Sequence, residues 1–104
     1  MISIVIPSHN NLRHLKNAYA SIKKHAPQAE VILYDDASTD GTWGWMLQTA
    51  TLDRNCKILK SDVRVGHTVL YDKGIKVATN EIVGIIHADM IMGPNYVENC
   101  IKHL

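Results

Sequence analysis

Short apolar runs alternate along this chain with longer segments in which apolar residues recur every three or four positions. The short runs, rich in β-branched residues, predict buried strands, whereas the helical spacing predicts amphipathic helices. The expected strands cover residues 2–6, 31–34, 57–59 and 81–86. The expected helices cover residues 11–25, a short stretch at 43–47, residues 68–78 and a last segment that begins near Pro94.

This order, in which each strand is followed by a helix, is typical of an α/β protein. Continuous apolar strands indicate a Rossmann-like, open and mostly parallel sheet with helices on both faces. We expect right-handed crossovers between the strands. The 104 residues suit one core and no linker or repeat divides them, so the prediction is a single domain over residues 1–104.

Composition narrows the class of protein only a little. Hydrophobic residues make up 46% and charged residues 20% of the chain, and the formal net charge is +1. Since a nucleic-acid-binding protein usually shows a basic face, the small net charge argues against nucleic acid as a partner. No apolar run approaches the length of a membrane span, and the N-terminus lacks the pattern of a signal peptide. Cys56 and Cys100 are far apart and indicate buried thiols in a cytoplasmic, reducing environment.

Polar segments follow three of the expected strands, at residues 7–10, 35–42 and 87–90. The carboxyl ends of parallel strands meet at one edge of a sheet, and ligands of open α/β sheets bind outside that edge. We therefore expect these three segments to form one ligand site.

The first of these segments has no glycine, and the chain has no G-x-x-x-x-G-K-[ST] motif, so neither common backbone cradle for phosphate is present. If a nucleoside diphosphate binds, a divalent cation is the natural way to neutralise it. Asp89 is the candidate ligand, because Mg²⁺ or Mn²⁺ is commonly held by one or two carboxylates together with substrate phosphates. The alternative is that Asp89 caps a turn. His87 is a weaker candidate ligand, since a lone histidine at a strand end is more often structural or a substrate contact.

Asp36 follows the second expected strand, where a carboxylate is well placed to accept a hydrogen bond from a ribose hydroxyl or a ring N–H. The alternative is that it caps the loop. Because we expect this loop to lie outside the core, the substitution Asp36→Asn should weaken nucleotide binding and hardly change stability. Asp40-Gly41 is expected to form a turn. The expected caps are Asn10 or Asn11 for the first helix and Ser38 or Thr39 for the second.

Residues 3–10, SIVIPSHN, and residues 31–42, VILYDDASTDGT, are similar to the opening strand and the D-D-x-S-x-D-G-T loop of inverting family-2 glycosyltransferases of the GT-A fold. Gly66 and Gly74-Ile75 resemble that family's G-x-x-x-x-R-N-x-G-I segment, and residues 87–89 occupy the place of its D-x-D motif. The resemblance covers essentially the whole chain. It implies the N-terminal, nucleotide-sugar-binding part of a longer enzyme.

The resemblance implies sugar transfer with inversion from a nucleotide sugar, with a UDP-sugar favoured, to an unknown acceptor. Mn²⁺ or Mg²⁺ would act as a Lewis acid on the leaving diphosphate. Asp36 would bind the base, His9 would stack on it, and Asp89 would hold the metal. The implied donor-binding set is Pro7, Ser8, His9, Asn10, Asp36, Ser38, Gly66, Lys73, His87, Ala88 and Asp89. No residue of the chain is identified as the catalytic base, which is expected beyond Leu104, so the chain alone is expected to be inactive in transfer.

The chain departs from the family pattern in two motifs. His87 replaces the first acid of D-x-D, and Tyr71-Asp72 replaces Arg-Asn, which removes a cation near the phosphates. Lys73 or Arg64 could supply that cation, although a solvated surface role is the alternative for each.

Three other classes of protein are alternatives to a glycosyltransferase. A non-catalytic nucleotide-sugar-binding module or an inactive fragment would share the motifs. A phosphate-receiver domain would carry its acidic pair after the first strand, and a nucleotidyltransferase would have a Gly- and Arg-rich first loop. A homo-oligomer is also possible through an apolar face of the last helix, formed by Val97, Cys100, Ile101 and Leu104.

Overall fold

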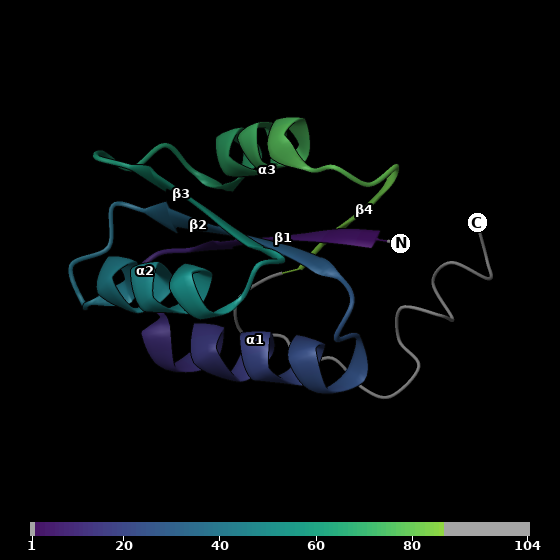
Figure 1. Cartoon of the computed structure of the whole chain (residues 1–104). Helices are drawn as coiled ribbons and strands as arrows, with labels where there is room; N and C mark the ends of the chain where they lie inside the picture. The colour runs from purple at the N-terminus through teal and green to yellow at the C-terminus, as the bar shows by residue number, and fades with distance from the viewer. Residues whose placement is uncertain (1, 87–104) are drawn as a thin grey trace.

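Four parallel strands lie in the order β3-β2-β1-β4 in the computed structural model, which describes residues 2–86. The strands are β1 (Ile2–Ser8), β2 (Glu30–Asp36), β3 (Cys56–Ser61) and β4 (Ile82–Ile85). The helices are α1 (Leu12–His25), α2 (Thr42–Leu52) and α3 (His67–Val77). Helices α1 and α2 lie on one side of the sheet and α3 lies on the other (Figure 1). The predicted α/β fold with an open parallel sheet is confirmed.

The strand order reverses direction at β1. The chain steps outward from β1 to β2 and β3, and then crosses back over the sheet through α3 to place β4 on the other side of β1. This crossing puts α3 on the face opposite α1 and α2 (Figure 1). The carboxyl ends of β1 and β4 therefore flank the topological switch point, which is where open α/β sheets bind ligands.

Alternate residues of the strands supply two apolar layers, as the strand period of two requires. The α1–α2 side of the core is made by Ile4, Ile6, Leu15, Ile22, Val31, Leu33 and Met46, all of which are buried. On the other side, α3 packs directly on β1: a Cβ added at Gly74 would lie 2.5 Å from Val5 Cγ1. Gly74 is therefore required by close packing of the helix on the strand.

Three strands run further than the apolar pattern predicts. β1 continues to Ser8 and β2 continues to Asp36, because Ser8 pairs with Asp35 in the parallel ladder. β3 continues to Ser61, which pairs with Asp36. α2 is also longer than the predicted stretch at 43–47. The last expected helix lies outside the described residues. None of the helices in residues 2–86 has the length and apolar character needed to cross a membrane.

Candidate functional site

Asp36 is the centre of the carboxyl edge of the sheet. Its side chain is buried, with an exposed fraction of 1% for the residue, and it accepts three hydrogen bonds from the loop that leads into α3. Val65 N donates to Oδ1 at 2.9 Å, while Gly66 N and Arg64 Nε donate to Oδ2, each at 3.2 Å. The prediction that this residue lies in a loop outside the core was wrong, because Asp36 is the last residue of β2 and is enclosed by the 64–66 loop.

The hydrogen bonds keep Asp36 charged in spite of its burial. Burial raises the pKa of the carboxyl, but the amides of Val65 and Gly66 and the guanidinium of Arg64 outweigh it, so the pKa lies below its ordinary value. A carboxylate offers about four lone-pair positions, and three of them are occupied here. The fourth, on Oδ1, receives no donor from the described residues.

Gly66 has a backbone φ of 85°, in the region that favours glycine, and it is the N-cap of α3. This conformation turns the Gly66 N–H toward Asp36. Arg64, whose side chain is 56% exposed, was expected to be a surface cation or a phosphate contact, and it proves to have a specific partner in Asp36.

The two loops that follow β1 and β2 are tied together by side chains. Asn10, at a φ of 48°, donates its N–H to Ser38 Oγ at 2.9 Å and accepts the N–H of Thr39 at 2.7 Å. His9 Nδ1 lies 2.6 Å from the Asp36 carbonyl oxygen and donates to it, which leaves Nε2 to accept from Asn10 Nδ2 at 3.2 Å. The structure thus joins His9, Asn10, Asp36, Ser38 and Gly66, five of the predicted donor-binding residues, in one network.

Asp40 joins the network to both helices that begin at this edge. Its Oδ2 accepts the N–H of Leu12 at 3.1 Å, and its Oδ1 accepts the N–H of Thr42 at 3.2 Å and the Thr42 hydroxyl. The predicted turn at Asp40-Gly41 is confirmed. The N-cap of α1 is Asn11, as predicted, although its side chain makes no capping hydrogen bond. The prediction of Ser38 or Thr39 for α2 was wrong, because its N-cap is Gly41. Asp40 supplies the side-chain cap of both helices.

Ser8 ends β1 beside the switch point. The residue is 2% exposed, and its Oγ has no hydrogen-bond partner among the described residues. A buried hydroxyl without a partner costs about 1–3 kcal/mol, so such groups are rare in folded proteins and mark places where water, an ion or a ligand atom binds. Pro7, also in the predicted set, is buried in β1 next to it.

A hollow of about 340 Å³ lies beside Asp35 and Ser38, toward the outer strand β3. Its wall includes Trp43, whose ring centroid is 5.2 Å from Lys60 Nζ, and Ser61, whose hydroxyl is 3.0 Å from that of Tyr34. Sequence reasoning missed this wall. The available signal was that Lys60 and Ser61 follow the third strand, at the same edge as the other loops.

The remaining predicted residues are not brought into the network. Lys73 is exposed on α3 and forms no hydrogen bond or ion pair with another candidate residue of the described part. His87, Ala88 and Asp89 lie outside the described residues, and so does the predicted metal position. Residues 2–86 contain no cluster of three His, Cys, Asp or Glu side chains that could hold a metal ion.

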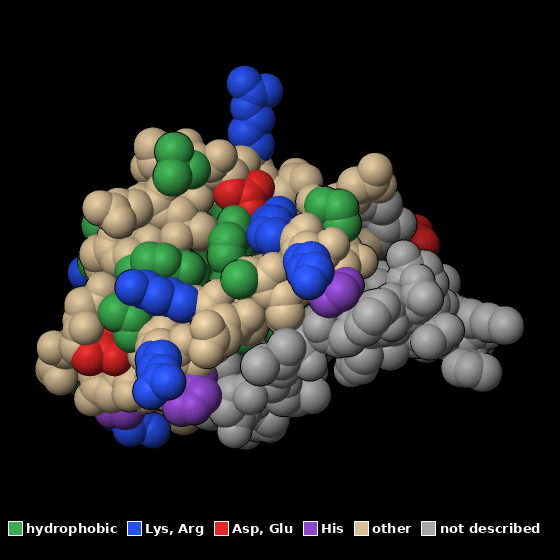
Figure 2. All heavy atoms as spheres, turned by 90° about the horizontal axis from the view of Figure 1, so that it is seen from below, with side chains coloured by type: hydrophobic (Ala, Val, Ile, Leu, Met, Phe, Trp, Pro, Cys, Tyr) green, Lys and Arg blue, Asp and Glu red, His purple; other side chains and the backbone are tan. Residues whose placement is uncertain are grey.

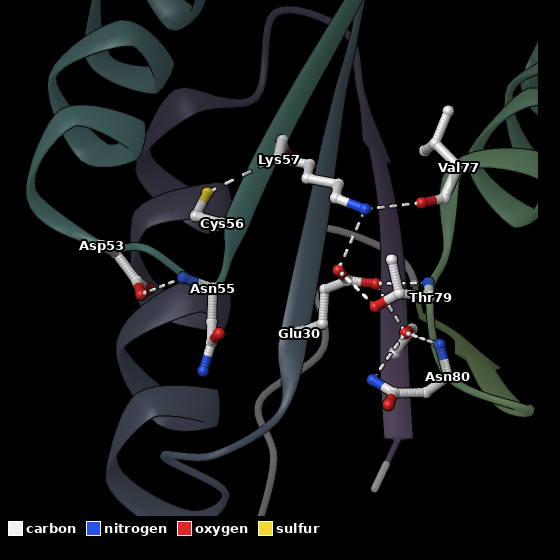
Figure 3. Close-up of polar contacts among 9 residues, drawn as sticks. Glu30, Asp53, Asn55, Cys56, Lys57, Val77, Thr79 and Asn80 are labelled. Atoms are coloured by element: carbon white, nitrogen blue, oxygen red, sulfur yellow. Dashed lines mark hydrogen bonds and ion pairs between the residues drawn. The ribbon is translucent and has the colours of Figure 1, made fainter.

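A second buried carboxylate, Glu30, lies at the opposite end of the sheet and serves the fold (Figure 3). Its oxygens accept from Ser3 Oγ at 2.7 Å, from the N–H and hydroxyl of Thr79, each at 2.9 Å, and from Lys57 Nζ at 3.2 Å. The network links β1, β2 and β3 to the segment before β4. Because every oxygen is engaged, Glu30 is a structural centre and the carboxyl edge remains the candidate site.

Known proteins match this chain over nearly its whole length. It is 31% identical to glycosyltransferase GlyG of Streptococcus pneumoniae serotype 4 over 109 aligned residues, which cover 100% of this chain and 35% of GlyG. Mannosyltransferase PcManGT from Pyrobaculum calidifontis, solved in complex with GDP-Man and Mn²⁺, has a TM-score of 0.87 at 23% identity and aligns with 97% of this chain and 31% of its own. TarS 1–349 of S. aureus in complex with UDP-GlcNAc has a TM-score of 0.84 at 20% identity, over 97% of this chain and 30% of its own.

These structural likenesses show a shared fold, and the chain spans about a third of the length of the curated relatives it matches. The sequence pattern of glycosyl transferase family 2 matches residues 3–104. That match includes both polar loops of the network around Asp36, and it extends over all but the first two residues of the chain. The chain therefore belongs to glycosyl transferase family 2.

Proposed function

We propose that this chain binds the nucleotide-sugar donor of a glycosyltransferase that transfers the sugar, with inversion, to an acceptor hydroxyl. The observation that carries the proposal is Asp36, a buried and charged carboxylate at the carboxyl edge with one acceptor position that no described residue fills. A ring N–H of a nucleobase is a suitable donor for that position. Family membership supports the same conclusion.

Two further groups at this edge fit a nucleotide. The Ser8 hydroxyl has no partner among the described residues and can bond a polar ligand atom. The His9 ring is fixed by hydrogen bonds at both nitrogens and could present its face to a base. Since Arg64 closes over Asp36, we propose that the base enters as the exposed Arg64 side chain moves aside.

Within residues 2–86, the acidic side chains at this edge suit a metal poorly. Asp36 and Asp40 are each committed to three N–H or O–H donors, and Asp35 accepts the N–H of Ser38 at 3.0 Å. We therefore keep Asp89 as the proposed ligand for Mn²⁺ or Mg²⁺, with His87 beside it. Oxygen ligands suit both ions, and the bound ion would neutralise the leaving diphosphate. The mannosyltransferase of similar fold was solved with Mn²⁺, which supports this proposal.

The donor nucleotide is proposed to be UDP, with GDP as the alternative, because the relatives of similar fold were solved with UDP-GlcNAc and with GDP-Man. The location is proposed to be cytoplasmic. The transfer step needs a base for the acceptor hydroxyl. We propose that this base comes from outside the chain and that the 104 residues alone bind the donor without transferring the sugar.

Calorimetric titration of the chain with UDP and GDP, in Mn²⁺ and in a chelator, tests the proposal. We expect one nucleotide to bind at least tenfold more tightly with the metal. Asp36→Asn should weaken that binding by roughly 1.5–3 kcal/mol, because an acceptor becomes a donor. Glu81→Gln, at an exposed residue just before β4 and at the opposite edge of the sheet, is the matched control and should bind normally. Failure of both nucleotides to bind would refute the proposal. Equal binding in the chelator would show that donor binding needs no metal ion, contrary to the role proposed for Asp89.

A further inference from the structure

Charge is distributed unevenly over the two faces of this nearly neutral chain. Helix α1 carries Arg13, Lys16, Lys23 and Lys24 but no acidic residue, and α2 carries no charged residue at all. Arg54 follows α2, where Asp53 is the acid. Figure 2 looks onto this layer of the molecule and shows Lys and Arg side chains recurring across it and outnumbering the acidic ones.

The basic residues of α1 form a stripe on its outer side. At 3.6 residues per turn, Arg13, Lys16, Lys23 and Lys24 project within about a third of the circumference, opposite the buried Leu15, Ala18 and Ile22. Lys23 is paired with Asp53 at 2.7 Å. Arg13, Lys16, Lys24 and Arg54 form no ion pair with any described residue, so their charges face solvent.

An apolar side chain stands beside this stripe. Leu52, at the end of the uncharged helix α2, is 88% exposed and borders the same hollow as Lys16. That hollow, of about 600 Å³, separates α1 from α2, with Lys16, Lys23 and Arg54 at its rim and Trp45 and Leu52 on its α2 side. The Trp45 ring meets Tyr19 edge to face, with centroids 5.6 Å apart.

We propose that the α1–α2 face docks on the surface of an anionic lipid bilayer. Cationic side chains beside a protruding aliphatic one are a combination that holds a protein at such a surface. Each exposed Lys or Arg near anionic lipid contributes about fivefold to the partition coefficient. A soluble polyanion would bind the cationic side chains and gain nothing from the exposed Leu52 side chain, whereas a bilayer would interact with both. The inference is independent of the proposed donor site, which lies at the carboxyl edge of the sheet.

Sedimentation of the 104-residue chain with lipid vesicles at low ionic strength tests this proposal. We expect binding to phosphatidylcholine vesicles that contain about 30% phosphatidylglycerol, none to pure phosphatidylcholine, and release by salt. The double variant Lys16→Gln, Lys24→Gln should lower the partition coefficient about 25-fold. Lys76→Gln, at an exposed residue of α3, is the matched control and should change it less than about twofold.

Leu52→Ser distinguishes a bilayer from a polyanion. We expect it to lower vesicle binding several-fold and to leave retention on a heparin column unchanged, with circular dichroism showing that every variant is folded. The proposal is overturned if the chain ignores anionic vesicles. It is also overturned if Lys76→Gln weakens binding as much as the α1 variant does, or if Leu52→Ser has no effect on vesicle binding.

Discussion

Arg64 Nε lies 3.2 Å from Asp36 Oδ2, so a half-exposed guanidinium closes over a carboxylate that is almost completely buried. The backbone N–H groups of Val65 and Gly66 complete the enclosure. The loop before α3 is thus fastened to the end of β2 through a single side chain. Because of this arrangement, Asp36 serves the fold and the candidate donor site together.

Asp36→Asn should therefore destabilise the chain, contrary to what the sequence alone led us to expect. The amide carries no charge, and its NH₂ group would face at least one of the three N–H groups that now donate to the carboxylate. This mismatch should lower the free energy of unfolding by about 2–3 kcal/mol. Urea unfolding measures this loss. Asp62→Asn is the control and should change the free energy of unfolding by less than about 0.5 kcal/mol, since its side chain is exposed. If both variants unfold at the same urea concentration, the enclosure of Asp36 contributes nothing to stability.

Two helical glycines should respond in opposite ways to replacement by alanine. In α3, a Cβ at Gly74 would lie 2.5 Å from Val5 Cγ1, and the resulting overpacking should destabilise the chain by about 1–3 kcal/mol. In α2, a Cβ at Gly44 would meet nothing within 4 Å, so Gly44→Ala should stabilise it by about 0.5–1 kcal/mol. Thermal unfolding should show a lower midpoint temperature for Gly74→Ala and a higher one for Gly44→Ala than for the parent chain. A Gly74→Ala variant as stable as the parent would show that α3 does not pack closely on β1.

Acid should destabilise the chain through four carboxylates, those of Glu30, Asp36, Asp40 and Asp53. In each, burial raises the pKa, but hydrogen bonds lower it by more, so the folded pKa lies below the ordinary 4.5 of Glu or 3.8 of Asp. A lowered folded pKa gives stability that is present above the unfolded pKa and is lost as the pH falls through the folded value.

Urea unfolding at a series of pH values between about 5.5 and 3 should therefore show the free energy of unfolding decreasing below about pH 4.5. Glu30→Gln should reduce the steepness of that decrease, because it removes one of the four groups. Stability that rises on acidification would contradict the assignment of these carboxylates.

The sequence predicted the sheet and the edge at which its polar loops meet, because strand and helix periods differ and the loops follow apolar runs. It did not predict that Asp36 would be buried. That burial depends on residues 64–66, which are remote in sequence and carry no apolar pattern. The role of Asp40 as the capping side chain of α1 was missed for a similar reason: it accepts from the N–H of Leu12, 28 positions away.

Net charge was also a poor guide to the surface. A value of +1 suggested no basic face, yet the cations of α1 gather on one side because helical spacing places Arg13, Lys16 and Lys24 together. The net charge does not say where the charged residues lie, whereas a helical projection shows which of them share one face of the helix.

Amide NMR spectra of the ¹⁵N-labelled chain, recorded during titration with UDP or GDP and Mg²⁺, test the central claim most directly. The account predicts that resonances of residues 8–10, 36–41 and 64–66 shift, while those of Lys57, Thr79 and Asn80 at the opposite end of the sheet remain in place. Shifts confined to the Glu30 end, or to the hollow between α1 and α2, would contradict a donor site at the carboxyl edge.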